Sequence, residues 1–240
     1  MNAALPVLAP DTLERLGRVA SATLSTQLFK LGFRNTCLTG LRAVNPGLRM
    51  AGEALTLRFV PGREDLSTFE NVTRADYPQR AAIEACRPGQ VLVVEGRGVD
   101  GAAIGGDIYM TRLQVRGAAG CVVDANVRDY ASIQALGLPV YARGPASPPH
   151  PARHLAVDWN VPIACSEVLV MPGDILVGDA DGVVCIPRHL ADEVARTGTE
   201  LDALEAFVVE KIRAGAPVPG TYPPDEKTRA EYEAWRKARG

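Results

Sequence analysis

The chain has 240 residues, with 26 basic and 28 acidic side chains and a formal net charge of −2. At about 150 residues per domain, this length fits one domain with additions or two domains, and it can bury a substantial core. Apolar residues make up 47% of the chain, and the charged residues (22%) are balanced in sign, which argues against disorder and against a basic nucleic-acid-binding surface. Only 5% of residues are aromatic, beside 23 glycines and 18 prolines, which indicates many tight turns around small aliphatic side chains.

The five cysteines form no closely spaced pair, and Cys121 and Cys185 lie in aliphatic runs. This pattern indicates reduced thiols in a cytoplasmic protein and argues against a cysteine zinc site. No stretch resembles a membrane span, and residues 1–10 carry no basic residue before their apolar part. We therefore expect neither a membrane anchor nor a secretory signal.

Helices and one strand are predicted in the first third of the chain. Asp11 and Glu14 have the spacing of a capping box, so a helix should follow them. A second helix is expected over about residues 21–31, and a third over 76–86. Residues 53–60 alternate in polarity and contain β-branched side chains, which predicts a strand.

The middle of the chain predicts a βαβαβ unit with parallel, buried strands. The expected elements are a strand at 90–95, a glycine-rich loop at 96–106, a helix at 107–116, a strand at 120–124, a helix at 129–136 and a strand at 139–142. Pro88-Gly89 and Pro172-Gly173 are typical of type II turns, and each precedes an aliphatic strand.

The last third predicts short strands and then helices. The strands are separated by turns without room for helices, so we expect a meander or a small barrel-like piece. They lie at 161–165, 168–170, 174–179 and 182–187. A helix over 188–213, a proline-rich connector at 216–224 and a charged helix over 225–239 should follow. We expect this last helix to pack outside the main body or against a neighbouring subunit.

A candidate anion site lies at Gly105, Gly106, Asp107 and Ile108, where the glycine-rich segment meets the predicted helix. Backbone N–H groups in the first turn of a helix lack intrahelical partners and lie at the positive end of the helix dipole. Glycine lets a ligand approach the backbone closely. A carboxylate or phosphate is therefore the expected ligand, although glycine runs also simply form turns.

Arg128 and Asp129 follow the strand at 120–124, and should reach the same sheet edge as the glycine-rich segment. Arg128 can hold a carboxylate or a developing enolate, and Asp129 can bind a hard cation such as Mg²⁺. The alternative is structural, with Asp129 capping the helix at 129–136 and Arg128 forming a surface ion pair.

His150 and His154 have the i, i+4 spacing of a helical metal pair, but the neighbouring prolines disfavour a helix. We expect a connector or a substrate-facing loop there rather than a metal site.

The spacing Asp107-X20-Arg128-Asp129 resembles the D-X20-R-D-X2-E/D signature of the RraA-like superfamily. That family contains 4-hydroxy-4-methyl-2-oxoglutarate/4-carboxy-4-hydroxy-2-oxoadipate aldolases and the regulator of ribonuclease E activity. Further similar segments are 39–41, 46–47, 87–96, 115–144 and 171–187. The sequence departs from the signature at Ser132, where the family has an acid, so metal affinity or substrate range is expected to differ.

The resemblance implies an α/β fold, namely a swivelling β/β/α domain related to phosphohistidine domains, with helical additions at both ends. We expect an N-terminal helical segment at 1–35, the central domain at 36–190 and a C-terminal helical extension at 191–240. A homotrimer or homohexamer is implied as the assembly.

The resemblance also implies roles for individual residues. The backbone of the helix-opening loop would bind the pyruvyl end of the substrate, with Arg128 on its oxygen. Asp129 would bind Mg²⁺ or Mn²⁺, and Asp107 would orient water on that metal. The loop residues are Gly105, Gly106, Asp107 and Ile108.

The implied function is a divalent-metal-dependent lyase that cleaves a 4-hydroxy-2-oxo acid to pyruvate through a metal-stabilised enolate. Oxaloacetate decarboxylation is the expected side activity, and no nucleic acid or membrane partner is expected. One alternative is a non-catalytic regulator that binds a protein such as a ribonuclease. Another is a hydratase or decarboxylase acting on a sugar-acid derivative. The presence of Asp107, Arg128 and Asp129 together favours the enzyme.

Overall fold

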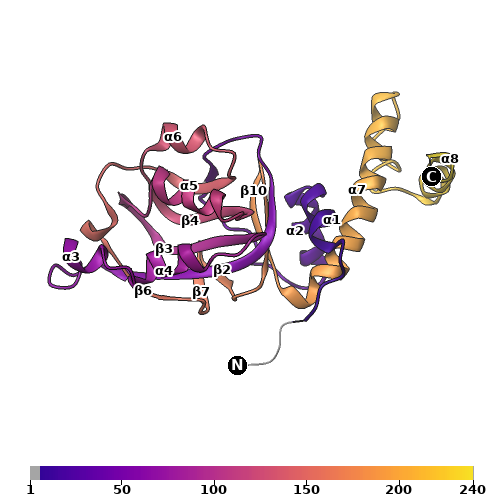
Figure 1. Cartoon of the computed structure of the whole chain (residues 1–240). Coiled ribbons are helices and arrows are strands. Elements are labelled where there is room, and N and C mark those ends of the chain that lie inside the picture. The colour runs from indigo at the N-terminus through magenta and orange to yellow at the C-terminus, as the bar shows by residue number, and fades with distance from the viewer. Residues whose placement is uncertain (1–5, 240) are drawn as a thin grey trace.

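A mixed β-sheet organises the chain (Figure 1). The structure is a computed structural model that describes residues 6–239, so residues 1–5 and 240 of the expected terminal segments lie outside it. Within the described part, the sheet has eight strands in the order β1-β5-β4-β3-β2-β9-β10, with β6 paired to β2. The strands of this sheet are β1 (Arg42–Ala43), β2 (Met50–Pro61), β3 (Gln90–Ala103), β4 (Gly120–Val127), β5 (Val140–Pro145), β6 (His154–Trp159), β9 (Ile175–Asp179) and β10 (Gly182–Ile186).

The predicted βαβαβ unit is confirmed. Strands β2, β3, β4 and β5 are parallel neighbours, and every residue of β4 is buried. Helices α4 (Pro78–Ala85), α5 (Asp107–Val115) and α6 (Tyr130–Gln134) pack on one face of this sheet through an aliphatic cluster. Because both faces are covered, the parallel strands are continuously apolar where they pack, as the sequence predicted.

The sequence predicted a glycine-rich loop over residues 96–106. In the structure most of this segment is a strand, because β3 continues to Ala103. The pairing of β3 with β4 shifts register after Val94 and again after Val99. Two polar side chains of β4, Asp124 and Asn126, accept hydrogen bonds from backbone N–H groups in this irregular part of β3. The hydrophobic pattern of a sequence does not reveal hydrogen bonds between the backbone of one strand and the side chains of its neighbour. The sequence therefore indicated only a loop here.

The four short strands that were expected to form one meander or small barrel-like piece form two separate hairpins instead. Strands β9 and β10 form a hairpin that extends the main sheet, with β9 antiparallel to β2. A separate two-stranded hairpin, β7 (Ile163–Cys165) and β8 (Val168–Val170), packs on the sheet face opposite α5 and α6. Strand β6, which the sequence analysis did not predict, pairs antiparallel with the end of β2.

Helices α1 (Thr12–Arg18), α2 (Ser21–Lys30) and the first half of α7 (Ala191–Arg213) pack together against β9 and β10. The second half of α7 extends away from the sheet and carries α8 (Glu226–Arg239) (Figure 1). The packing of α8 on α7 joins the rings of Phe207, Tyr232 and Trp235. The final helix therefore lies outside the main body, as expected.

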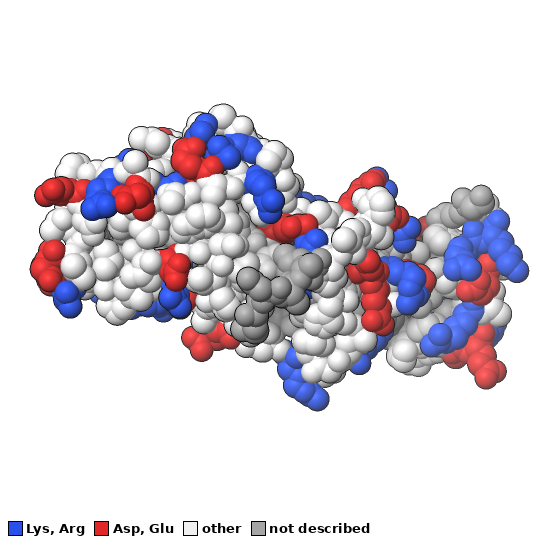
Figure 2. Space-filling model, turned by 60° about the horizontal axis from the view of Figure 1, so that its bottom comes forward, with Lys and Arg blue, Asp and Glu red and all other residues white. Residues whose placement is uncertain are grey.

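The capping box expected at the start of α1 does not form. The Asp11 side chain makes no capping hydrogen bond and instead forms an ion pair with Arg15 at 2.6 Å. No helix in residues 6–239 combines the length and the apolar character that crossing a membrane requires. On the face shown in Figure 2, basic and acidic side chains are interspersed rather than gathered into one basic patch.

Candidate functional site

A pocket of about 390 Å³ lies at the start of α5, at the carboxyl ends of β3 and β4. All the residues predicted for the site line this pocket. They are Gly105, Gly106, Asp107, Ile108, Arg128 and Asp129. Its remaining lining residues come mainly from the short helix α3 (Phe69–Val72), from the start of α4 and from residues 149–151. Ser132 is exposed on α6 and is not among the lining residues.

The first turn of α5 is uncapped on its pocket side. Gly106 occupies the N-cap position and has no side chain that could accept a hydrogen bond from this turn. Gly105 has φ +93°, a left-handed conformation that glycine adopts without strain. The Gly105 carbonyl accepts a hydrogen bond from Arg128 N (3.1 Å), which joins the two candidate loops. The free N–H groups of Asp107 and Ile108 can therefore serve a ligand anion.

Asp129 lies directly against Gly106. A Cβ atom on Gly106 would stand 2.3 Å from Oδ2 of Asp129, so a larger residue at position 106 would displace the carboxylate. Asp129 itself has φ 55°, in the left-handed region that Asp tolerates better than most residues. Its Oδ2 is 3.4 Å from Nε of Arg128, and both side chains are about half exposed. The backbone of α5 and this Arg–Asp pair thus share one wall of the pocket.

The alternative role predicted for Asp129, capping the helix that follows it, is wrong. Asp129 precedes α6 at the N-cap position, but its side chain makes no capping hydrogen bond. The expected surface ion pair of Arg128 exists, and its partner is Asp129 itself. The two side chains therefore interact with each other at the pocket instead of closing the start of α6.

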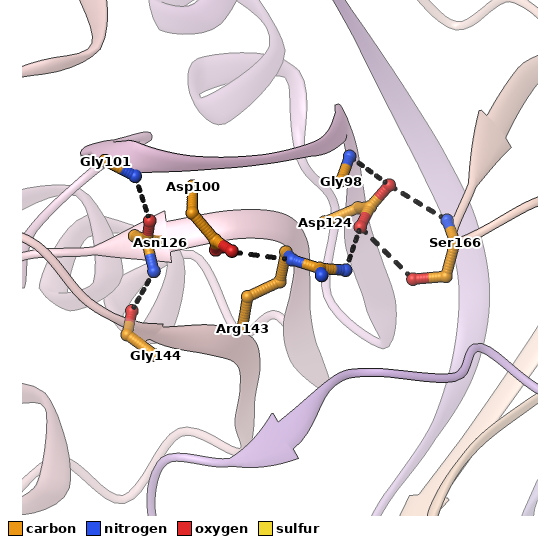
Figure 3. Close-up of polar contacts among 8 residues, drawn as sticks. All are labelled: Gly98, Asp100, Gly101, Asp124, Asn126, Arg143, Gly144 and Ser166. Atoms are coloured by element: carbon orange, nitrogen blue, oxygen red, sulfur yellow. Dashed lines mark hydrogen bonds and ion pairs between the residues drawn. The ribbon is translucent and has the colours of Figure 1, made fainter.

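Asn126 is hydrogen-bonded to both neighbouring strands, β3 and β5 (Figure 3). Its Oδ1 accepts a hydrogen bond from Gly101 N (2.8 Å), and its Nδ2 donates one to Gly144 O (3.3 Å). The Asn126 carbonyl accepts a further hydrogen bond from Ile104 N (2.8 Å). One residue of β4 therefore joins β3 and β5, two residues before Arg128.

Asp124 makes a second set of contacts two residues earlier on β4 (Figure 3). The residue is 2% exposed, and its carboxylate accepts hydrogen bonds from Gly98 N and Ser166 N, both at 3.0 Å. Ser166 Oγ donates to the same carboxylate at 3.2 Å, and Nη1 of Arg143 lies 3.6 Å away. Asp124 therefore joins β3, β5 and the turn between β7 and β8, and these partners compensate the burial of its carboxylate.

His150 lines the pocket from a short 3₁₀ turn and is 9% exposed. Its Nε2 lies 3.4 Å from the Tyr77 hydroxyl, and the two rings stack with centroids 5.9 Å apart. Burial, with the neighbouring charges of His154 and Arg128, lowers the pKa of His150 to about 4. The imidazole is therefore neutral at pH 7, and it lines the same pocket as the residues predicted for the site.

His154, the second histidine of the i, i+4 spacing, lies beside an arginine. It is fully buried at the start of β6, where its Nδ1 lies 3.2 Å from Nη2 of Arg97. Burial and the positive charges of Arg97 and Arg153 lower the pKa of His154 to about 4. In residues 6–239, no group of three or more His, Cys, Asp or Glu side chains is arranged to hold a metal ion.

Arg80 is a pocket residue that the sequence analysis missed. It belongs to the first turn of α4, and its buried Nε has no hydrogen-bond partner. One local feature of the sequence could have identified Arg80: a cation in the first turn of a helix interacts unfavourably with the helix dipole. Such departures from local preference concentrate at functional sites.

Comparisons with known proteins agree with the fold and with the family resemblance. A family model described as "RraA-like: Aldolase/RraA" matches residues 21–185. A "Putative 4-hydroxy-4-methyl-2-oxoglutarate aldolase" of Halalkalibacterium halodurans is 30% identical over 163 residues, which are 68% of this chain and 71% of that protein.

Two solved structures share the fold. The RraAS2 protein of Streptomyces coelicolor, described as an unusual member of the RNase ES inhibitor RraA protein family, matches with a TM-score of 0.75 and 32% identity. The match covers 85% of this chain and 98% of that one. An uncharacterized protein of Pseudomonas syringae pv. tomato matches with a TM-score of 0.78 and 25% identity, over 90% and 99% of the two chains. The expected α/β fold class is thereby confirmed, and the chain belongs to the RraA-like family.

Proposed function

We propose that this protein is a divalent-metal-dependent lyase that cleaves a 4-hydroxy-2-oxo acid and releases pyruvate. The observation that carries the proposal is that one pocket contains the uncapped first turn of α5, Arg128 and Asp129. An anion-binding backbone, a guanidinium and a carboxylate are the groups that enolate chemistry on a 2-oxo acid requires. The aldolase relative supports the same activity.

The residues at the pocket fit a hard divalent cation. Asp129 supplies carboxylate oxygens, the ligands that Mg²⁺ and Mn²⁺ prefer, and Asp107 lines the same pocket, where it would orient water on the ion. Since no larger ligand cluster exists in the described residues, such an ion would keep most of its coordination for water and substrate, as Mg²⁺ commonly does. When bound beside Asp129, the cation supplies Lewis-acid stabilisation of negative charge on the keto oxygen.

The chain's own residues account for the remaining chemistry. The N–H groups at the start of α5 bind the substrate carboxylate. When the C3–C4 bond breaks, its electron pair moves to C3 and onto the C2 oxygen, where Arg128 stabilises the charge. The C4 hydroxyl loses its proton as it becomes a carbonyl, and C3 gains a proton to give pyruvate. Asp107, at the first helical position, is placed to hold or orient the proton donor.

Pyruvate release from 4-hydroxy-2-oxo acids and from oxaloacetate, with added Mg²⁺ or with EDTA, tests this function. We expect a rate that EDTA abolishes and that Arg128→Ala and Asp129→Ala each reduce at least about a hundredfold. Arg112→Ala is the matched control, because Arg112 pairs with Glu84 on the exposed side of α5. Near wild-type turnover in Arg128→Ala or Asp129→Ala would contradict the proposal.

A second candidate is a non-catalytic regulator, which the similarity to RraAS2 favours. The same assay separates the two, because a regulator releases no pyruvate from any substrate in the presence of metal. A hydratase or decarboxylase acting on a sugar-acid derivative would instead show metal-dependent turnover confined to that substrate class. We further propose a homotrimer or homohexamer, which light scattering of the purified protein measures.

A further inference from the structure

The pocket contains a second guanidinium that the proposed bond cleavage does not use. Arg80 lines the pocket, and its Nε is buried without a hydrogen-bond partner. Nearby Arg74 and Arg112 pair with Asp76 and Glu84, whereas Arg80 forms no ion pair with any residue in the described range 6–239. Because the charge of Arg80 has no ion-pair partner among these residues, the side chain favours an anionic ligand in the pocket that it lines.

A neutral hydrogen-bond donor comes from the same side of the pocket. Tyr77, the N-cap residue of α4, precedes Arg80 by one turn and stacks on His150. The Tyr77 hydroxyl accepts a hydrogen bond from Ala156 N at 2.8 Å, so its own proton is free for Nε2 of His150 at 3.4 Å. In the neutral imidazole the ring proton then lies on Nδ1, which becomes a donor. Arg80 and His150 both line the pocket, so each side chain can contribute an N–H donor there.

The charges that line the pocket are balanced. Arg80 and Arg128 oppose Asp107 and Asp129. The divalent cation of the proposed function would therefore leave a surplus of two positive charges for the ligand. A dianion neutralises this surplus, and a monocarboxylate does not.

We propose that Arg80 determines substrate specificity by binding a second carboxylate of the 2-oxo acid, with His150 donating a hydrogen bond to the same group. This inference rests on the proposed function, because it takes the keto acid end of the substrate to lie at α5 and Arg128. Arg80 acts in binding this distal group and takes no part in bond cleavage.

The test compares two ligands that share one carbon chain, 2-oxoglutarate and 2-oxopentanoate, which end in a carboxylate and a methyl group. Neither has the 4-hydroxyl group that cleavage requires, so calorimetry with Mg²⁺ measures binding alone. We expect wild type to bind 2-oxoglutarate at least about tenfold more tightly, as a charge-assisted contact allows. Arg80→Gln should remove this preference and leave 2-oxopentanoate binding unchanged, while Arg80→Lys should keep part of it.

Arg87→Gln, at an exposed turn after α4, is the control for loss of one positive charge and should keep the full preference. Thermal unfolding of each variant verifies the fold. Equal binding of the two ligands to wild type, a preference that survives in Arg80→Gln, or an equal loss of both ligands in Arg80→Gln would each overturn the proposal. The pyruvate assay is independent, since Arg80-dependent binding without pyruvate release refutes the lyase alone. Pyruvate release without any preference refutes the role of Arg80 alone.

Discussion

The carboxylate of Asp129 packs on the backbone of Gly106, with Oδ2 only 2.3 Å from where a Cβ of residue 106 would stand. The two residues belong to different βα connections, and the contact joins the proposed metal ligand to the proposed anion-binding turn. Gly106 has φ −143°, a conformation open to any residue. The need for glycine at this position is therefore steric and comes from Asp129.

Gly106→Ala is expected to displace the Asp129 carboxylate and to reduce metal-dependent pyruvate release at least about tenfold, without unfolding the protein. Activity and Mn²⁺ binding by calorimetry measure the effect. The control is Gly17→Ala in α1, where a Cβ would meet its nearest neighbour, Ala51, at an ordinary 3.4 Å. That change should leave activity intact and raise stability by about 0.5–1 kcal/mol. Unaltered metal binding in Gly106→Ala would refute the steric argument.

Asn126→Ala should lower the free energy of unfolding by about 1–3 kcal/mol, because it leaves Gly101 N and Gly144 O without their partner. Activity should fall as well, since this part of β3 leads into Gly105. Urea unfolding and the pyruvate assay measure the two effects. Asn35→Ala, which removes an exposed hydrogen bond to Glu167 O, should cost about 0.5 kcal/mol or less. Equal losses in the two variants would contradict the assigned role of Asn126.

The two buried histidines predict a dependence of stability on pH. The pKa values of His150 and His154 fall from an ordinary 6.5 to about 4 in the folded protein. Between these values the unfolded chain binds protons that the folded chain does not, so stability is complete above pH 6.5 and is lost as pH falls toward 4. Each histidine should contribute about 1–3 kcal/mol to this loss.

Urea unfolding between pH 6.5 and 5 isolates the histidines from most carboxylates. His150→Gln and His154→Gln should each flatten the slope of unfolding free energy against pH, and the double variant should flatten it most. A slope in the double variant as steep as in wild type would show that other groups cause the pH dependence.

Ser132→Asp restores the acid that the family signature has at this position. Ser132 lies in the first turn of α6, where a negative charge also suits the helix dipole. We expect a gain in metal affinity of about twofold to fivefold at low salt, because the added charge is exposed and screened. Gln134→Asp adds the same charge at the other end of α6 and should have a smaller effect. Calorimetry with Mn²⁺ compares them, and equal affinities in all three proteins would contradict the prediction.

Much of the fold followed from local patterns. The aliphatic runs that become β3, β4 and β5 alternate with helical segments, and such an order permits only parallel strands with covered faces. The continuation of β3 past Val94 did not follow, because its partners are the side chains of Asp124 and Asn126 rather than a regular ladder. Strand β6 was missed for a similar reason, since its pairing with β2 joins segments about a hundred residues apart.

For the site, the sequence by itself determined the groups on one wall of the pocket. Glycines before a helix and an Arg-Asp pair after a strand must meet at the carboxyl edge of a parallel sheet, whatever the rest of the chain does. Only the tertiary structure decided what lies on the other wall, where Arg80 and His150 come from a helix and a 3₁₀ turn. The positions of Arg80 and His150 depend on how α4 packs on the sheet and on the stacking of Tyr77 with His150. Such long-range packing leaves no periodic signal in the sequence, because it is set by the shapes of the surfaces that meet.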